Sequence, residues 1–183
     1  NKRTMPPELT ADDAVRLIAS GDRVYLHEAA MAPHELIEAL VRRAPELHDV
    51  ETVSMHTDGP APHVDRAMEG HIRHNALFVG SNVRAAVKEG RADYTPVFLS
   101  DVPHLISSRR LKIDVALVQV SPPDAHGFCR LGLSIACARS AVDHATTVIA
   151  LVNPHVPRTM GNSSVHISRF AAVVHADRPL PEV

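Results

Sequence analysis

Two six-residue runs without a charged side chain constrain the fold more than any other feature of this sequence. Residues Val115 to Val120 and Thr147 to Val152 are almost continuously apolar and rich in β-branched side chains. A strand of this composition has to be covered on both faces, which is typical of the central strands of a parallel sheet. We therefore expect both runs in central strands of one sheet.

Strand-like and helix-like patterns alternate along the rest of the chain. Further strands are expected at residues 23–26, 50–55, 76–79 and 94–99, where Pro96 marks the last as an edge strand or a bulge. Helices are expected between them, at residues 10–19, 33–41, 81–89, 101–110 and 135–145. This alternation predicts an α/β fold with a mainly parallel sheet and helices on both faces. Two glycines within residues 124–132 predict a β-excursion between the central strands.

Three residues indicate where helices begin and end. Thr10 precedes two aspartates in the pattern of a capping box, and Gly21 stands where a left-handed residue would end that first helix. Pro33 suits the first turn of the second helix, because proline needs no amide partner there.

Composition predicts a single domain spanning residues 1–183, with residues 177–183 as the start of an interdomain linker. The net charge is −2, with no basic excess, so no nucleic-acid partner is expected. No apolar run is long enough for a membrane span, and residues 1–5 do not resemble an export signal. Cys129 and Cys137 are expected as free thiols, which favours a cytoplasmic protein.

Polar or small residues follow four of the expected strands. In an open parallel sheet, ligands bind outside the carboxyl ends of the strands. The four junctions are His27–Ala30, His56–Gly59, Gly80–Asn82 and Ser100–Asp101. We expect them to line one cleft that accepts a carboxylate, a phosphate or a developing oxyanion. Capped helix starts occur in every α/β domain, so an ordinary structural role for each junction stays open.

Two of these junctions carry a serine with a further expected role. Ser81 and Ser100 are expected to cap the helices that follow them, and Gly80 to let a ligand approach the backbone closely. The glycine spacing of a dinucleotide site and the lysine of a phosphate-binding loop are both missing.

The sequence gives no support for a metal centre or for a cysteine or serine nucleophile. Thirteen histidines are scattered, and only His71 and His74 stand close together, without the spacing of a zinc site. Cys129 is interpreted as a small apolar residue of the β-excursion, and no nucleophile elbow is present.

Five stretches, taken in order, resemble the acetyl-CoA hydrolase/transferase family, and within it the 4-hydroxybutyrate CoA-transferase branch. They are residues 55–59 (MHTDG), 70–75 (GHIRHN), 77–84 (LFVGSNVR), 115–129 (VALVQVSPPDAHGFC) and 152–159 (VNPHVPRT). A weaker similarity to succinyl-CoA:3-oxoacid transferases lies in the Val-Gly-x-Asn turn at residues 79–82. The resemblance extends from about residue 9 to residue 181.

This resemblance implies an enzyme with two related α/β domains and an active site between them, an architecture shared with sugar-phosphate isomerases. In the family a glutamate of the second domain attacks the acyl-CoA thioester in a ping-pong cycle without a metal, and coenzyme A is a substrate. No stretch of this chain matches the one that carries that glutamate. The chain is therefore expected to form one wall of the cleft and to be inactive alone.

The resemblance and the junctions together give a set of expected substrate-binding residues and partners. The partners are an acyl-CoA, a small carboxylate, the second domain and, in the full-length protein, further copies of the chain. No catalytic residue is expected in this segment. The expected substrate-binding residues are Ala30, Met31, His56, Thr57, Gly80, Asn82, Ser100, Asp101, Gln119 and Pro122.

Four alternatives remain at this point. One is an acyl-CoA hydrolase of the same family, and another is a sugar-phosphate isomerase or amino-sugar deaminase with the same architecture. The third is a non-catalytic domain that binds a partner. The last is a natural subunit whose partner chain carries the glutamate. Separately, Glu28 follows the first expected strand and could reach the cleft, so it is the one internal rival for the role of nucleophile.

Overall fold

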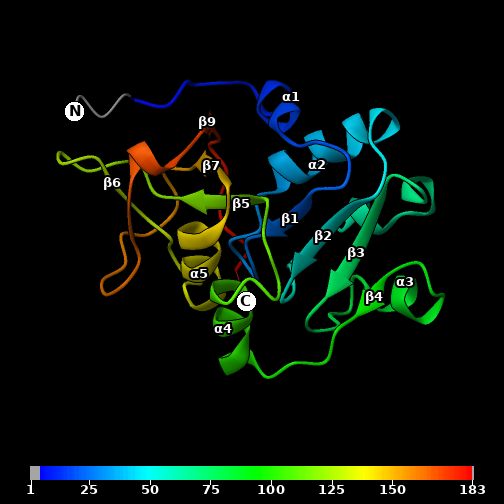
Figure 1. The fold of residues 1–183 in the computed structure, drawn as a ribbon. Helices are drawn as coiled ribbons and strands as arrows, with labels where there is room; N and C mark the ends of the chain where they lie inside the picture. Colours follow the sequence, from blue (N-terminus) through cyan, green and yellow to red (C-terminus); the bar gives the residue numbers. More distant parts are fainter. Residues whose placement is uncertain (1–4, 183) are drawn as a thin grey trace.

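The structure, a computed structural model, describes residues 5–182 and contains a seven-stranded sheet (Figure 1). Residues 1–4 and 183, which the sequence analysis assigned to the chain start and to the linker, lie outside the described residues. The strand order is β4-β3-β2-β1-β5-β7-β9, and every neighbouring pair is parallel. The strands are β1 (Arg23–Leu26), β2 (Val50–Ser54), β3 (Ile72–Ala76), β4 (Asp93–Tyr94), β5 (Val115–Val120), β7 (Thr147–Val152) and β9 (Ala172–His175).

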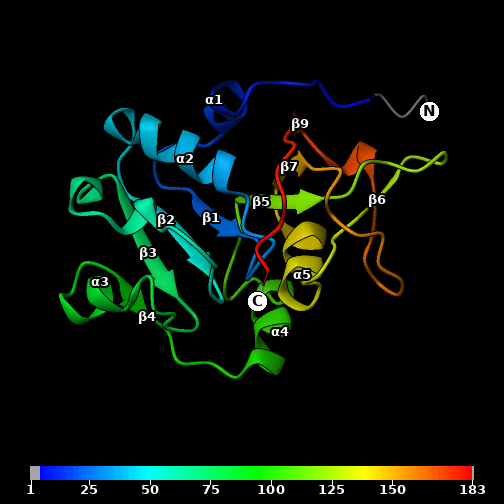
Figure 2. The ribbon, with the colours of Figure 1, turned by 180° about the vertical axis from the view of Figure 1, so that it is seen from behind.

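Helices cover both faces of this sheet, as the sequence predicts. They are α1 (Ala11–Ala14), α2 (His34–Arg43), α3 (Arg84–Lys88), α4 (Val102–Ser107) and α5 (Ala136–His144). Figures 1 and 2 show α1 and α2 on one side of the central strands and α4 and α5 on the other. The amide of Asp13 donates to the hydroxyl of Thr10 at 3.1 Å, which confirms the expected cap of α1.

The two apolar runs form the centre of the sheet, as predicted. All six residues of β5 are buried, and alternate side chains point to opposite faces. Ala116 and Val118 pack with α4 and α5, whereas Val115 and Leu117 pack with α1 and α2. Burying a side chain such as Leu117 contributes about 1.5–3 kcal/mol, so these strands anchor both layers.

The predicted β-excursion is confirmed. β6 (Phe128–Arg130) pairs antiparallel with β8 (Ser164–His166) to form a separate two-stranded sheet. Figure 1 shows the chain around β6 extending away from the seven-stranded sheet.

Four local predictions are wrong. The third strand lies at Ile72–Ala76 instead of residues 76–79, and the fourth is limited to Asp93–Tyr94 instead of reaching residue 99. No strand was expected at Ala172–His175, which forms the edge of the sheet. The first helix passes into a 3-10 turn that ends at Leu17, so Gly21 is not its terminal cap. Among residues 5–182, no helix combines the length and the apolar character that crossing a bilayer requires.

Candidate functional site

The backbone beyond β1, β2 and β3 stays hydrogen-bonded after the strands end, which holds three junctions side by side. The amide of Ala29 donates to the carbonyl of His56 at 2.8 Å, and Ala29 also pairs with Thr57 in an isolated bridge. The amide of Phe78 donates to the carbonyl of Met55 at 3.0 Å. The carboxyl ends of these strands therefore present one continuous surface, where a parallel sheet binds its ligands.

A cavity of about 490 Å³ opens on this surface, a volume in the range of small-molecule sites. The exposed fractions of its lining residues distinguish the floor of the cavity from its rim. Met55 and Leu77 are buried at its floor, whereas Phe78, Phe98 and Leu99 are more than half exposed at its rim. Twelve residues line it, of which Glu28, His56 and Tyr94 are titratable: Glu28, Ala29, Met55, His56, Leu77, Phe78, Tyr94, Val97, Phe98, Leu99, Ser134 and Ala136.

Glu28 is the buried carboxylate of this cavity, 4% exposed. The Ser134 hydroxyl donates to Glu28 Oε1 at 2.9 Å, and the hydroxyl of Tyr25 donates to Oε2. Burial first, and then the charge of Glu28, raise the pKa of Tyr25 well above its usual range. The tyrosine therefore stays a protonated donor, and both carboxylate oxygens act as acceptors.

The buried ring of His27 helps to position the segment that carries Ser134. The Gln119 amide donates to His27 Nδ1 at 3.1 Å, so Nε2 carries the proton and donates to the Ser134 carbonyl at 2.8 Å. Burial lowers the pKa of His27, which keeps the ring neutral in this arrangement. The ring is thus a structural link between β5 and the segment that carries Ser134.

The second and third junctions meet beside the cavity. The His56 ring packs edge-on against Phe78, with ring centroids 5.7 Å apart. The side-chain amide of Asn82 donates to the carbonyls of Thr57 at 2.8 Å and Gly59 at 3.0 Å. A Cβ added to Gly80 would lie 3.1 Å from Asn82 Oδ1, so this turn leaves little room for a side chain. His56, Thr57, Gly80 and Asn82 therefore lie together, as the sequence analysis expected of this junction pair.

Other expected site residues lie elsewhere. Met31 and Gln119 are buried behind the first junction, where the side-chain Nε2 of Gln119 donates to the Met31 carbonyl at 3.3 Å. Asn153 donates to Gln119 Oε1 at 2.9 Å, which completes a buried polar chain that the sequence did not reveal. Pro122 follows β5 at the base of the excursion. None of these residues lines the cavity described above.

The remaining candidates are at the periphery of the cavity. Ala30 is half-buried next to the lining residue Ala29. Ser100 and Asp101 are exposed in the 3-10 turn Leu99–Asp101, whose first residue lines the cavity. The expected serine caps are wrong, because α3 starts after Val83 and α4 after Asp101, and neither has a side-chain cap.

Sequence reasoning missed the aromatic rim and Ser134. Phe78 and Phe98 were assigned to strands, because their apolar neighbours mimic a buried run. A usable signal was present, since the chain has only four phenylalanines and two of them follow the strands of the expected cleft.

Metal and thiol chemistry find no support at this cavity. No group of three metal-ligating side chains occurs within residues 5–182. Burial raises the pKa of Cys129 to about 11 and that of Cys137 to about 12, so both thiols stay protonated near neutral pH.

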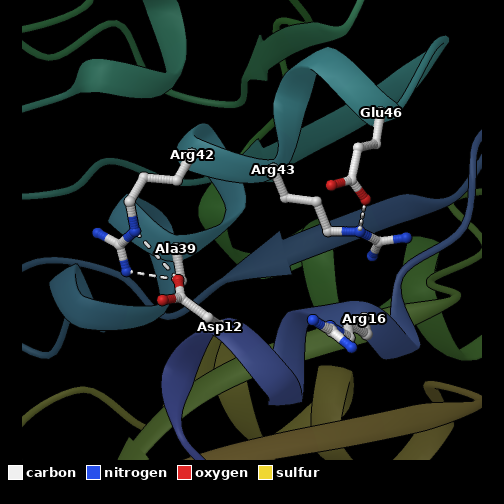
Figure 3. Close-up of a pocket in the computed structure, with 6 residues that line it drawn as sticks. All are labelled: Asp12, Arg16, Ala39, Arg42, Arg43 and Glu46. Atoms are coloured by element: carbon white, nitrogen blue, oxygen red, sulfur yellow. Dashed lines mark hydrogen bonds and ion pairs between the residues drawn. The ribbon is translucent and has the colours of Figure 1, made fainter.

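A second depression, of about 190 Å³, lies between α1 and α2 (Figure 3). Arg42 donates to Asp12 from Nε at 3.0 Å and from Nη2 at 2.7 Å, and Arg43 pairs with Glu46 at 3.4 Å. Arg42 and Arg43 are thus paired with carboxylates of the same depression, and Arg16 pairs with the neighbouring Asp13 at 3.7 Å. It lies on a helical layer away from the carboxyl ends of the strands, so we do not assign it a ligand.

Comparisons with known proteins identify the type of domain. The profile described as "Acetyl-CoA hydrolase/transferase N-terminal domain" matches residues 4–182. A "4-hydroxybutyrate coenzyme A transferase" of Clostridium kluyveri is 43% identical over 96% of this chain and 41% of its own length. A "Succinyl-CoA:acetate/propanoyl-CoA:succinate CoA transferase" of Fasciola hepatica is 40% identical over 94% of this chain and 36% of its own length. The chain thus spans about two fifths of the curated relatives it matches.

Solved structures agree with the sequence comparisons. RipA from Yersinia pestis superposes with a TM-score of 0.89 and 27% identity, over 97% of this chain and 44% of that one. A 4-hydroxybutyrate CoA-transferase from Porphyromonas gingivalis gives a TM-score of 0.82 and 29% identity, over 97% of this chain and 41% of that one.

Proposed function

Because the chain belongs to the acetyl-CoA hydrolase/transferase family, we propose that it forms the amino-terminal wall of a CoA-transferase active site. The complete protein then moves coenzyme A between an acyl-CoA and a small carboxylate, of the acetyl-CoA and 4-hydroxybutyrate type. The substrate-facing wall comprises the cavity together with Ala30, His56, Thr57, Gly80 and Asn82. Met31 and Gln119 support that wall from behind, and Ser100, Asp101 and Pro122 lie at its margins.

The observation that supports this proposal is the apolar cavity at the carboxyl ends of the strands. None of its twelve lining residues is an arginine or a lysine, so it suits an acyl chain better than a phosphate. A phosphosugar enzyme would need cationic or amide contacts to its phosphate. The cavity therefore favours the transferase over the isomerase alternative.

The proposed chemistry divides between two domains. A glutamate of the second domain attacks the thioester carbonyl and expels CoA thiolate, leaving an acyl-glutamyl anhydride. The thiolate then attacks the glutamyl carbonyl and releases the acyl group as its carboxylate. The glutamyl thioester formed in this way passes CoA to the acceptor carboxylate by the reverse steps. The present chain binds the acyl group and excludes water, which would hydrolyse the anhydride.

Glu28 is not the nucleophile in this scheme. Both of its oxygens accept hydrogen bonds from neutral hydroxyls, and its side chain is almost fully buried at the cavity floor. A carboxylate that attacks a thioester would have to give up at least one of these donors. We therefore expect Glu28→Gln to keep turnover with acyl groups that end in a methyl group.

The test compares three preparations with butyryl-CoA as donor and acetate as acceptor. They are the chain alone, the chain joined to a carboxyl-terminal domain of the family, and the joined protein with Glu28→Gln. We expect CoA exchange from both joined proteins and none from the chain alone. Exchange by the chain alone that is lost in Glu28→Gln would overturn the proposal. Thioester loss without acceptor would assign the hydrolase alternative instead.

A further inference from the structure

Glu28 is the one carboxylate among the residues that line the cavity, and it lies at the floor. It is 4% exposed, whereas Phe78 is 57% and Phe98 is 78% exposed at the rim. An acyl chain that enters between the aromatic rings therefore places its distal end, and not its thioester, next to the carboxylate. Glu28 would therefore lie next to the terminal group of the acyl chain, which is the group that distinguishes butyryl, 4-hydroxybutyryl and succinyl chains.

The side chain of Glu28 is hydrogen-bonded to two hydroxyl groups and has no cation beside it among residues 5–182. The Ser134 hydroxyl donates to Glu28 Oε1 and the Tyr25 hydroxyl donates to Glu28 Oε2. None of the ion pairs within residues 5–182 includes Glu28. Each carboxylate oxygen still has a lone pair for a further donor.

The floor of the cavity should bind acyl chains with different terminal groups with different affinities. A methyl end would contact Met55 and Leu77, which line the same cavity, and would leave the hydrogen bonds of Glu28 intact. A hydroxyl end can donate to Glu28, whereas a second carboxylate would face a like charge in a site of low dielectric. Electrostatic repulsion over a few ångströms in such a site is worth a factor of about 10 to 100 in relative affinity.

We propose that Glu28 is a specificity-determining residue that admits acyl groups with a methyl or hydroxyl end and rejects those with a second carboxylate. This inference rests on the proposed function and narrows its substrate class.

The experiment uses three acceptors with the same four-carbon skeleton: butyrate, 4-hydroxybutyrate and succinate. The full-length protein that carries this domain is assayed with acetyl-CoA as donor, and kcat/KM is measured for each acceptor. We expect butyrate and 4-hydroxybutyrate to exceed succinate by about tenfold or more. In Glu28→Gln, the value for succinate should rise relative to the value for butyrate, so the butyrate-to-succinate ratio should fall toward one.

Two controls make each outcome decisive. Glu38→Gln changes an exposed glutamate of α2 outside the cavity and should leave all three values unchanged. Succinate matching butyrate in the unchanged protein would refute the inference even if Glu28→Gln did not fold. A ratio that is the same in Glu28→Gln and in the unchanged protein would also refute it. A lack of transfer with every acceptor would instead refute the proposed function.

Discussion

Charged side chains are paired with opposite charges at the amino ends of the strands, whereas Glu28 at the carboxyl ends has no such partner among residues 5–182. At the amino ends of the strands, charged side chains neutralise one another: Arg23 pairs with Glu51 at 2.9 Å and Arg73 with Asp93 at 2.6 Å. At the carboxyl ends, Glu28 is held by hydroxyl groups alone and faces an apolar cavity. The amino ends of the strands thus carry ion pairs that suit a role in stability, whereas the carboxyl ends keep a carboxyl group without a paired cation and exposed aromatic rings, which suits the proposed binding role.

Lowering the pH should destabilise the two ends of the sheet in different pH ranges, and we expect this to be the largest change in the free energy of unfolding. The loop after β2 rests on three buried histidines, His34, His63 and His74, and the His63 and His74 rings lie 4.8 Å apart. Burial lowers the pKa of His74 to about 4 and that of His63 well below its usual range. The unfolded chain binds protons at these sites near pH 6.5, whereas the folded chain does not. Stability is therefore retained above pH 6.5 and lost as the pH falls toward 4.

The expected loss from His74 alone is about 3 kcal/mol between pH 6.5 and 4. The amino edge should respond in a different window. Arg73 holds the pKa of Asp93 below its usual value, so that ion pair persists until the pH falls below about 4. Denaturant unfolding at a series of pH values measures both windows. A free energy of unfolding that stays flat from pH 6.5 to 4.5 would contradict the histidine assignment.

His63→Leu sharpens this prediction. Both ring nitrogens of His63 are buried and have no hydrogen-bond partner among residues 5–182, so an apolar side chain of similar size loses no contact of this kind. We expect unchanged or higher stability at pH 7 and a smaller loss on acidification. Destabilisation by more than about 1 kcal/mol at pH 7 would instead reveal a hydrogen bond to a bound water.

Tyr25→Phe should have the next largest effect. The change removes one of the two donors to Glu28 and leaves a buried carboxylate oxygen unsatisfied, at a cost of about 1–3 kcal/mol. Tyr94→Phe removes the same hydroxyl from a half-exposed ring of the same cavity, and it should be nearly neutral. Thermal unfolding of the two variants compares them directly. Equal effects would mean that the Tyr25 hydroxyl does not hold Glu28.

The same contrast explains what the sequence could predict. β5 and β7 were identifiable because a strand buried on both faces is apolar at nearly every position. β3 was misplaced by four residues because the true strand, Ile72–Ala76, alternates apolar and polar side chains and includes the buried His74. The apolar residues that follow it were mistaken for the strand, although Phe78 lies at the cavity rim.

The fourth strand was overextended for a related reason. Val97, Phe98 and Leu99 look like the end of a strand, yet Val97 and Phe98 lie in a loop along the cavity and Leu99 begins a 3-10 turn. Local periodicity records that a side chain is apolar but not what covers it. Local patterns also do not show which distant residues meet. Glu28 is an example, since its donor Ser134 is more than one hundred residues away in the chain. The location of the site at the carboxyl ends of the strands could thus be predicted from the sequence. The cavity itself could not, because it is formed by contacts between segments that are far apart in the chain.

Arg73→Met should be a smaller change, at the opposite edge. The arginine donates to both oxygens of Asp93, but both side chains are about half exposed, and solvent screens their attraction. We expect a loss below about 1 kcal/mol that shrinks further in high salt. Chemical denaturation at low and high ionic strength checks this. A loss above 2 kcal/mol would show that the amino edge is more than a set of screened surface pairs.

Phe98→Ala should have the smallest effect on stability and still disturb function. The ring is 78% exposed, so its removal exposes little that was buried, and the free energy of unfolding should change by less than about 0.5 kcal/mol. In Phe170→Ala, the same truncation at a 4% exposed ring should cost about 3–5 kcal/mol, which calibrates the measurement. If the rim covers an acyl chain, Phe98→Ala should lower kcat/KM for butyryl-CoA about tenfold in the full-length protein. Unchanged kcat/KM would remove Phe98 from the binding surface and leave its exposure unexplained by the proposed site.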